Sequence, residues 1–204
     1  MRYFVTGNCG FISSHLTERL LSQGHEVYGI DNLEFGSEEN MNSFRNHENF
    51  KFFKKDFSDV DEMNDLISIF GFKKLKFDGV FHLGASARIQ RSLTNPSRTY
   101  ACNADGTLNI LEMMRGLHIP RIVYSGSSSV YGIGDVPNRV SDKEDCLNPY
   151  SASKAIGEKL CTTWAKCFGI KAIVLRYFNV YGPREDITSN YSPIIGLFFK
   201  QKLK

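Results

Sequence analysis

Tyr150 and Lys154 stand four residues apart in the stretch Asn148-Pro149-Tyr150-Ser151-Ala152-Ser153-Lys154. On a helix this spacing places both side chains on one face. The Lys154 cation then favours the phenolate, so we expect it to lower the pKa of Tyr150 towards neutrality. A tyrosine tuned in this way can act as a general base towards an alcohol. A surface helix without a catalytic role can carry the same pair. A catalytic role for Tyr150 and Lys154 therefore depends on a hydride acceptor elsewhere in the chain.

A glycine motif near the N-terminus predicts a site for such an acceptor. Thr6-Gly7-Asn8-Cys9-Gly10-Phe11-Ile12-Ser13 lies where an apolar strand turns into an amphipathic helix. Gly7 permits the tight turn, Gly10 lets the backbone approach a pyrophosphate, and the helix N-terminus offers free N–H groups. Ser13 occupies the third position, where glycine is usual, and we expect a slightly wider helix contact there. A glycine turn without a ligand is the alternative.

An acidic residue at the end of the next strand favours NAD over NADP. Asp31-Asn32 follows the glycines by about twenty positions, where a carboxylate accepts hydrogen bonds from the adenosine ribose hydroxyls and repels a 2′-phosphate. The alternative is a solvated loop aspartate. Asp56, after the third apolar run, is a weaker candidate for the adenine amino group, because acids at strand ends are common.

A run of hydroxyl side chains supplies a possible partner for the substrate. Ser127 lies in Val123-Tyr124-Ser125-Gly126-Ser127-Ser128-Ser129-Val130-Tyr131-Gly132, at the end of a predicted strand. Ligands bind at this edge of open α/β sheets, so a hydroxyl there can bond a substrate oxygen while Tyr150 removes its proton. A serine run can also be a flexible turn.

Short apolar runs alternate with amphipathic stretches along the whole chain, as in βαβ units. We expect strands at 3–6, 26–30, 50–54, 79–83, 121–125 and 172–176, and helices at 11–23, 60–70, 100–117 and 150–168. Polar loops are expected at 32–49, 132–148 and 182–192, with a short apolar piece at 194–199. The predicted fold class is α/β, a Rossmann-type doubly wound parallel sheet with helices on both faces.

Composition excludes several other classes of function. The 204 residues are 42% hydrophobic and 23% charged, and 25 basic against 22 acidic residues give a net charge of +3. The basic residues are scattered, so no nucleic-acid partner is indicated. No apolar span or leader is evident, which indicates neither membrane insertion nor export and favours the cytoplasm. Five cysteines lack CxxC or zinc-like spacing, so we expect reduced thiols and no metal.

Taken in order, seven motifs resemble the extended short-chain dehydrogenase/reductase family, and within it the NAD-dependent nucleotide-sugar epimerases and dehydratases of the UDP-glucose 4-epimerase type. The similarity covers essentially the whole chain. The motifs are TGxxGFI at 6–12, Asp31-Asn32, His82-Leu83-Gly84-Ala85, Asn103-Ala104-Asp105-Gly106-Thr107, Ser127 before Val130-Tyr131-Gly132, Tyr150-xxx-Lys154, and Arg176-Tyr177-Phe178-Asn179-Val180-Tyr181-Gly182-Pro183-Arg184.

The resemblance implies a role for each matching residue. Tyr150 is the base, Lys154 holds the nicotinamide ribose, and Ser127 bonds the substrate oxygen. Asn179 contacts the diphosphate of the sugar nucleotide, and Phe178 lies beside the nicotinamide. The other cofactor-contact positions are Gly7, Gly10, Phe11, Ile12, Asp31, Asn32, Asp56, Phe57, Leu83, Gly84, Ala85 and Asn103.

The resemblance also implies transient oxidation of the sugar at C4, with NAD regenerated in each turnover. Dehydratases and decarboxylases of this family carry an acid at one or both positions before Val-Tyr-Gly. Here those positions are Ser128 and Ser129, which do not titrate near neutrality, so 4-epimerisation of a UDP-sugar is the leading reading.

Relatives continue past the stretch resembling 192–204 into a substrate domain. We therefore expect residues 1–204 to form an NAD-binding domain without it, either as a fragment or as a naturally short homologue. An NAD-binding protein with a regulatory role and no turnover stays open as the alternative. The helices at 100–117 and 150–168 match the pair through which relatives form a homodimer, so a homodimer is expected. The sequence does not name the sugar.

Overall fold

The computed structural model describes residues 1–134, 136–186, 195, 198 and 201–202. Six parallel strands form one sheet in the order β3-β2-β1-β4-β5-β6. The strands are β1 Arg2–Thr6, β2 Glu26–Ile30, β3 Phe50–Phe53, β4 Gly79–His82, β5 Arg121–Ser127 and β6 Lys171–Tyr177. The order reverses between β1 and β4, which makes this edge the switch point of a Rossmann-type fold. The predicted fold class is confirmed.

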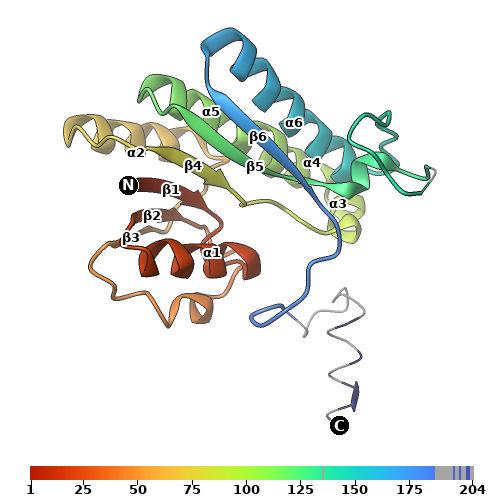
Figure 1. The fold of residues 1–204 in the computed structure, drawn as a ribbon, viewed down its shortest axis with the longest axis horizontal. Coiled ribbons are helices and arrows are strands. Elements are labelled where there is room, and N and C mark those ends of the chain that lie inside the picture. The colour runs from red at the N-terminus through yellow and green to blue at the C-terminus, as the bar shows by residue number, and fades with distance from the viewer. Residues whose placement is uncertain (135, 187–194, 196–197, 199–200, 203–204) are drawn as a thin grey trace.

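Helices cover both faces of the sheet, with α1 on one face and α2, α5 and α6 on the other (Figure 1). The α-helices are α1 Phe11–Ser22, α2 Val60–Phe72, α3 Ile89–Thr94, α4 Pro96–Tyr100, α5 Gly106–Gly116 and α6 Pro149–Phe168. Short 3₁₀ turns occupy Glu38–Met41 and Ser128–Tyr131, and a π-turn, η2, occupies Ala101–Asp105. The single helix predicted at 100–117 is therefore divided between α4, η2 and α5. The end of the loop predicted at 182–192 and most of the apolar piece at 194–199 lie outside the described residues.

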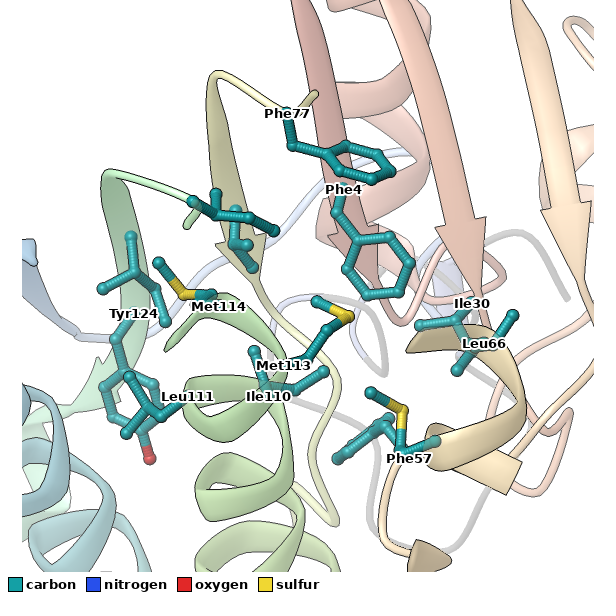
Figure 2. Close-up of a cluster of buried hydrophobic side chains, with 14 of the residues drawn as sticks. Phe4, Ile30, Phe57, Leu66, Phe77, Ile110, Leu111, Met113, Met114 and Tyr124 are labelled. Atoms are coloured by element: carbon teal, nitrogen blue, oxygen red, sulfur yellow. The ribbon is translucent and has the colours of Figure 1, made fainter. Parts of the chain in front are cut away.

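Each face of the sheet carries its own apolar core, because successive side chains of a strand point to opposite faces. In β1, Phe4 packs towards α2 and α5, whereas Val5 packs towards α1. Figure 2 shows the larger cluster, in which Phe4, Ile30 and Met113 lie close together. All three are fully buried. The two cores fix the sheet between its helices and so fix the edge at which the strands end.

Helix α6 begins with a complete set of start signals. The Asn148 side chain accepts a hydrogen bond from the Ser151 amide at 2.9 Å, and the Ser151 hydroxyl accepts one from the Asn148 amide at 3.2 Å. Pro149 occupies the first helical position, where its missing N–H costs nothing. Gly169, at φ 71°, ends the helix in the left-handed conformation. Tyr150 is thus held in the first turn of a well-defined helix.

Two kinds of feature are absent from the described residues. In this part of the chain, no helix combines the length and apolar character needed to cross a bilayer. No group of three His, Cys, Asp or Glu side chains within the same residues could hold a metal ion. All five cysteines are free, and three of them are buried.

Candidate functional site

A cleft of about 770 Å³ opens at the carboxyl edge of the sheet, across the switch point between β1 and β4. This volume is within the ~300–1,000 Å³ typical of small-molecule sites. Turns and strand ends from four parts of the sheet line it: Gly7, Cys9 and Gly10 after β1, Asp31 and Asn32 after β2, Leu83, Gly84 and Ala85 after β4, and Ser125, Gly126 and Ser127 in β5. Tyr150 and Lys154 of α6 complete the wall.

The glycine turn lies directly against the loop after β4. Gly7 has φ 76°, and a Cβ there would lie 2.8 Å from the Cα of Gly84, so a side chain at Gly7 would push the two loops apart. The Ser13 hydroxyl donates a hydrogen bond to the Gly7 carbonyl. Ser13 therefore ties α1 to the turn, in place of the close glycine contact. Gly10, the N-cap of α1, provides no side-chain cap, which leaves the first-turn amides available to an anion.

Asp31 directly follows β2, and both of its carboxylate oxygens are already bonded to the backbone. Oδ2 accepts from the Cys9 amide at 2.9 Å and Oδ1 accepts from the Leu33 amide at 2.8 Å. Burial raises the pKa of Asp31, and these two hydrogen bonds oppose that shift. Each oxygen retains a second lone pair, so the carboxylate can still accept from a ligand. Asn32, beside it, donates to Asp56 Oδ2 at 2.9 Å and also lines the cleft.

Asp56 is held in a polar network with Asn32, Ser58 and Arg98. Arg98 donates to its Oδ2 at 2.7 Å, and the Ser58 amide and hydroxyl donate to its Oδ1 at 2.8 and 2.6 Å. Burial alone would raise the pKa of Asp56, but the hydrogen bonds from Ser58 and Asn32 and the charge of Arg98 lower it. Asp56 is not among the described residues that line the cleft. Its predicted contact with adenine stays a prediction.

The floor of the cleft depends on Phe57, which is buried and lies edge-on to His82 with ring centroids 5.3 Å apart. A Cβ on Gly84 would lie 2.5 Å from the Phe57 ring, and one on Gly106 would lie 2.6 Å from it. Two glycines on different elements thus make room for one aromatic ring. Phe57, Leu83, Gly84 and Ala85 all line the cleft, as do Phe11 and Ile12.

Ser127 at the end of β5 and Tyr150 in the first turn of α6 both line the cleft, and the Ser127 side chain is close enough to Tyr150 to favour its phenolate. Ser127 also contacts the Ser129 hydroxyl at 2.9 Å and is 8% exposed. Burial raises the pKa of Tyr150, while the nearby Ser127 side chain and the charge of Arg88 oppose the rise. The expectation that Lys154 lowers the pKa of Tyr150 towards neutrality is therefore wrong for the protein alone.

The position of the Lys154 side chain explains why Lys154 does not lower the pKa of Tyr150. Its Nζ is 4.5 Å from the centroid of the Tyr124 ring and the side chain is buried, 3% exposed. Burial lowers the pKa of Lys154 to about 8, and Cys102, Cys161 and Glu158 nearby oppose that shift. The ammonium is thus a buried cation at the wall of the cleft, partnered by an aromatic face, with donors that a ligand hydroxyl can use.

Asn103 lies one layer behind the cleft, in the π-turn η2. Its Oδ1 accepts from the Ser86 amide at 2.8 Å, and its Nδ2 donates to the Ser86 carbonyl at 3.1 Å and to the Ser153 hydroxyl at 2.9 Å. Both amide protons are therefore used within the protein. Asn103 is absent from the described lining of the cleft, so the structure places it as a brace between the loop after β4 and helix α6.

The segment after β6 brings one of its two predicted residues to the cleft. Phe178 lines it and lies near Tyr131, with ring centroids 6.3 Å apart. Asn179 is exposed and is not among the described lining residues. The same segment returns to α1, where His15 Nε2 lies 2.9 Å from the Pro183 carbonyl oxygen and Arg184 pairs with Glu18 at 2.7 Å. The predicted contacts of Phe178 with the nicotinamide and of Asn179 with the sugar-nucleotide diphosphate stay predictions.

Several lining residues were not singled out by the sequence reading. Arg88 and Arg91 lie at the start of α3, Cys102 lies in η2, and Glu185 follows β6. For Arg88, Arg91 and Glu185, which follow strands β4 and β6, the available signal was that loops at the carboxyl edge carry ligands. Ser125 also lines the cleft, and its buried hydroxyl has no hydrogen-bond partner. This unpartnered hydroxyl, the uncapped start of α1 and the buried Lys154 fit a dinucleotide such as NAD.

The fold and this cleft together define a Rossmann-type dinucleotide-binding protein. Comparison with known proteins narrows the class: residues 3–202 match the NAD dependent epimerase/dehydratase family, and the chain belongs to it. A curated relative, the UDP-glucuronate 4-epimerase of Thermodesulfobacterium geofontis, is 35% identical over 187 residues. That match covers 89% of this chain but 56% of the relative, so the chain spans little more than half of the longer protein.

Solved structures give the same result. The UDP-N-acetylglucosamine 4-epimerase of Methanobrevibacter ruminantium, in complex with UDP-N-acetylmuramic acid, is 36% identical with a TM-score of 0.90. The match covers 99% of this chain and 62% of that one. The Thermus thermophilus UDP-glucose 4-epimerase in complex with NAD is 32% identical with a TM-score of 0.81, over 94% of this chain and 59% of that one. The predicted family is confirmed, and the relatives support NAD as the cofactor.

We predict that acid destabilises the protein partly through His82. Burial, with the charge of Lys154, lowers the pKa of His82 from 6.5 to about 3. Between these values the unfolded chain binds the proton and the folded one does not, so His82 contributes stability above pH 6.5 that is lost as the pH falls towards 3. From pH 7.5 to 5 the loss is about 2 kcal/mol. Urea unfolding of the wild type and His82→Gln at both pH values should show a smaller loss in the variant; equal losses would refute this.

Proposed function

We propose that this chain is the NAD-binding part of a UDP-sugar 4-epimerase. The observation that carries the proposal is that the side chains of Ser127 and Tyr150 line one cleft together with the glycine turn at Gly7 and Gly10. Two hydroxyls that meet at one wall can hold a single substrate oxygen and take its proton. The resemblance of the whole chain to 4-epimerases supports the same reading.

In this proposal Tyr150 removes the proton from the C4 hydroxyl, and Ser127 holds that oxygen through a hydrogen bond. When bound, NAD supplies the hydride acceptor and a positive charge in the cleft. Because burial raises the pKa of Tyr150 in the protein alone, we expect the phenol to ionise readily only when the cleft is filled. Tyr150 returns the proton after the 4-keto sugar has turned over, so no net acid or base is consumed.

The remaining cofactor contacts are proposed from position. Asp31 takes the adenosine ribose and Lys154 takes the nicotinamide ribose, since both are buried groups with spare hydrogen-bonding capacity at the cleft. The uncapped start of α1 at Gly10 takes the pyrophosphate. Phe178 lies beside the nicotinamide, and Asn179 contacts the sugar-nucleotide diphosphate.

Dehydration of the sugar is the second candidate chemistry. Ser128 and Ser129, next to Ser127, are not acids, which disfavours elimination of water. Glu185 also lines the cleft, however, and burial raises its pKa while Arg88 opposes the rise. A carboxyl group of this kind could act as an acid. The products separate the two reactions, since dehydration gives a 4-keto-6-deoxy sugar and epimerisation a C4 epimer.

The assembly and compartment are also proposals. Helices α5 and α6 pack side by side, and their outer surface carries Trp164, Phe168 (51% exposed) and Arg115, whose guanidinium lies 5.6 Å from the Phe168 ring centroid. We propose that this surface forms a two-fold homodimer in the cytoplasm, where the free cysteines stay reduced. Light scattering that shows only monomer would refute the dimer.

The test is a panel of UDP-sugars offered to the protein translated from the complete reading frame. UDP-glucose, UDP-N-acetylglucosamine and UDP-glucuronate are incubated in turn, and the products are followed by proton NMR. The proposal expects C4 inversion of at least one sugar. A protein that binds NAD but converts none of them would instead have a binding or regulatory role.

A further inference from the structure

Thr6, the last residue of β1, uses every hydrogen-bonding position of its hydroxyl. Its Oγ1 accepts from the Leu83 amide at 3.0 Å and from the Gly84 amide at 2.8 Å. A hydroxyl has two acceptor positions and one proton, so both acceptor positions are filled. Its proton therefore points to the remaining neighbour, His82 Nδ1, at 2.7 Å. His82 Nδ1 must then be the unprotonated nitrogen of the ring.

The other end of the chain of hydrogen bonds assigns the same tautomer. The Asn103 carbonyl can only accept, so the Thr107 hydroxyl donates to it, at 2.6 Å. The Thr107 oxygen must in turn accept from His82 Nε2, which lies 3.0 Å away. Both ends therefore place the single ring proton on Nε2. His82 is 1% exposed, so water does not compete for either nitrogen.

The chain of hydrogen bonds continues from the π-turn to the proposed base. The Asn103 amide holds the backbone of Ser86 on one side and donates to the Ser153 hydroxyl at 2.9 Å on the other. Ser153 donates to the carbonyl of Tyr150 at 2.8 Å. A series of hydrogen bonds thus runs from Thr6, through His82 and Thr107, to the backbone of Asn103, and continues from the Asn103 side chain to the backbone of Tyr150.

We propose that His82, in its Nε2–H form, is a positioning residue: it holds the π-turn through Thr107 and thereby sets where Tyr150 stands relative to Ser127. This rests on the proposed role of Tyr150 as the base. His82 itself is not among the described residues that line the cleft. Its effect on Tyr150 must pass through Asn103 and Ser153.

Substitution of Thr107 with valine removes one hydroxyl from this series of hydrogen bonds. Thr107→Val removes the link and keeps the shape of the side chain, whereas Thr107→Ser keeps the link. We expect Thr107→Val to let Tyr150 move away from Ser127 and so raise the titration midpoint of Tyr150 by about 0.5 pH unit or more. Turnover should fall about fivefold at unchanged KM and NAD affinity. Thr107→Ser should restore both values.

The titration of Tyr150 is followed by ¹³Cζ NMR without any sugar, so it remains informative if the parent protein shows no epimerase activity. Thr162→Val is the matched control, because Thr162 is exposed on α6 and its hydroxyl also bonds the helix backbone, at 3.0 Å. His82→Gln retains an N–H donor for Thr107 and should leave the Tyr150 midpoint near that of the wild type.

Ring ¹⁵N NMR of the unmodified protein supplies a test that needs no variant. A proton on Nε2 of His82, with Nδ1 unprotonated, supports the proposal. A proton on Nδ1 would overturn it. So would an unchanged Tyr150 midpoint in Thr107→Val, or an equal shift in Thr162→Val.

Discussion

Tyr150→Phe is expected to lower kcat by about 10³-fold while NAD remains bound. The substitution removes only the hydroxyl, which is the proposed proton acceptor, and leaves the half-buried ring in the first turn of α6. Ser127 remains to hold the substrate oxygen but cannot take the proton at neutral pH. Turnover is measured by NMR on the protein translated from the complete reading frame, and NAD binding by calorimetry.

Tyr28→Phe is the matched control for this prediction. Tyr28 packs between Phe53 and Phe77 in the core and lies outside the described lining of the cleft, so loss of its hydroxyl should leave turnover unchanged. Retention of more than about a tenth of the wild-type rate by Tyr150→Phe would exclude Tyr150 as the base.

Asp31→Asn is expected to weaken NAD binding about tenfold and to reduce the preference for NAD over NADP. The amide keeps the shape of the carboxylate and one acceptor for the Cys9 and Leu33 amides, but it loses the charge that favours ribose hydroxyls and repels a 2′-phosphate. Hydrogen bonds to charged groups contribute about 1.5–3 kcal/mol, which sets the scale of the loss.

Binding of both dinucleotides is measured by calorimetry, beside Asp65→Asn as a control. Asp65 is exposed on α2, where its carboxylate pairs with Lys55 at 3.3 Å, so this variant makes the same charge change outside the described lining of the cleft. An unchanged ratio of NAD to NADP affinity in Asp31→Asn would remove the proposed ribose role.

The sheet was predictable because its signals are local. Each strand is a short apolar run that ends in glycine or polar residues, and the alternation with amphipathic stretches defines a parallel sheet. The division of the helix predicted at 100–117 was not predictable in this way. The π-turn at Ala101–Asp105 is stabilised by bonds that Asn103 makes to Ser86 and Ser153, far away in the sequence. Helix α3 has six residues, too few for a clear period.

The positions of the site residues were predictable where they follow from the order of strands and turns. The glycine turn, Ser127 and Tyr150 meet at the cleft as expected, because strand ends converge on one edge. The electrostatics were not predictable from spacing. Lys154 lies on the same helix as Tyr150, but its ammonium lies over the ring of Tyr124, and burial dominates the pKa of both groups. Burial and aromatic contact depend on tertiary packing, which a four-residue interval does not reveal.

The most direct test of the central proposal is epimerisation in D₂O, followed by proton NMR at C4 of the sugar. Transient oxidation removes the C4 hydrogen as hydride and returns it to the other face, whereas the proton that Tyr150 handles exchanges with solvent. The account therefore predicts C4 inversion with the original hydrogen retained, in the NAD-loaded protein translated from the complete reading frame. Inversion with deuterium incorporated at C4, or no inversion of any UDP-sugar, would contradict it.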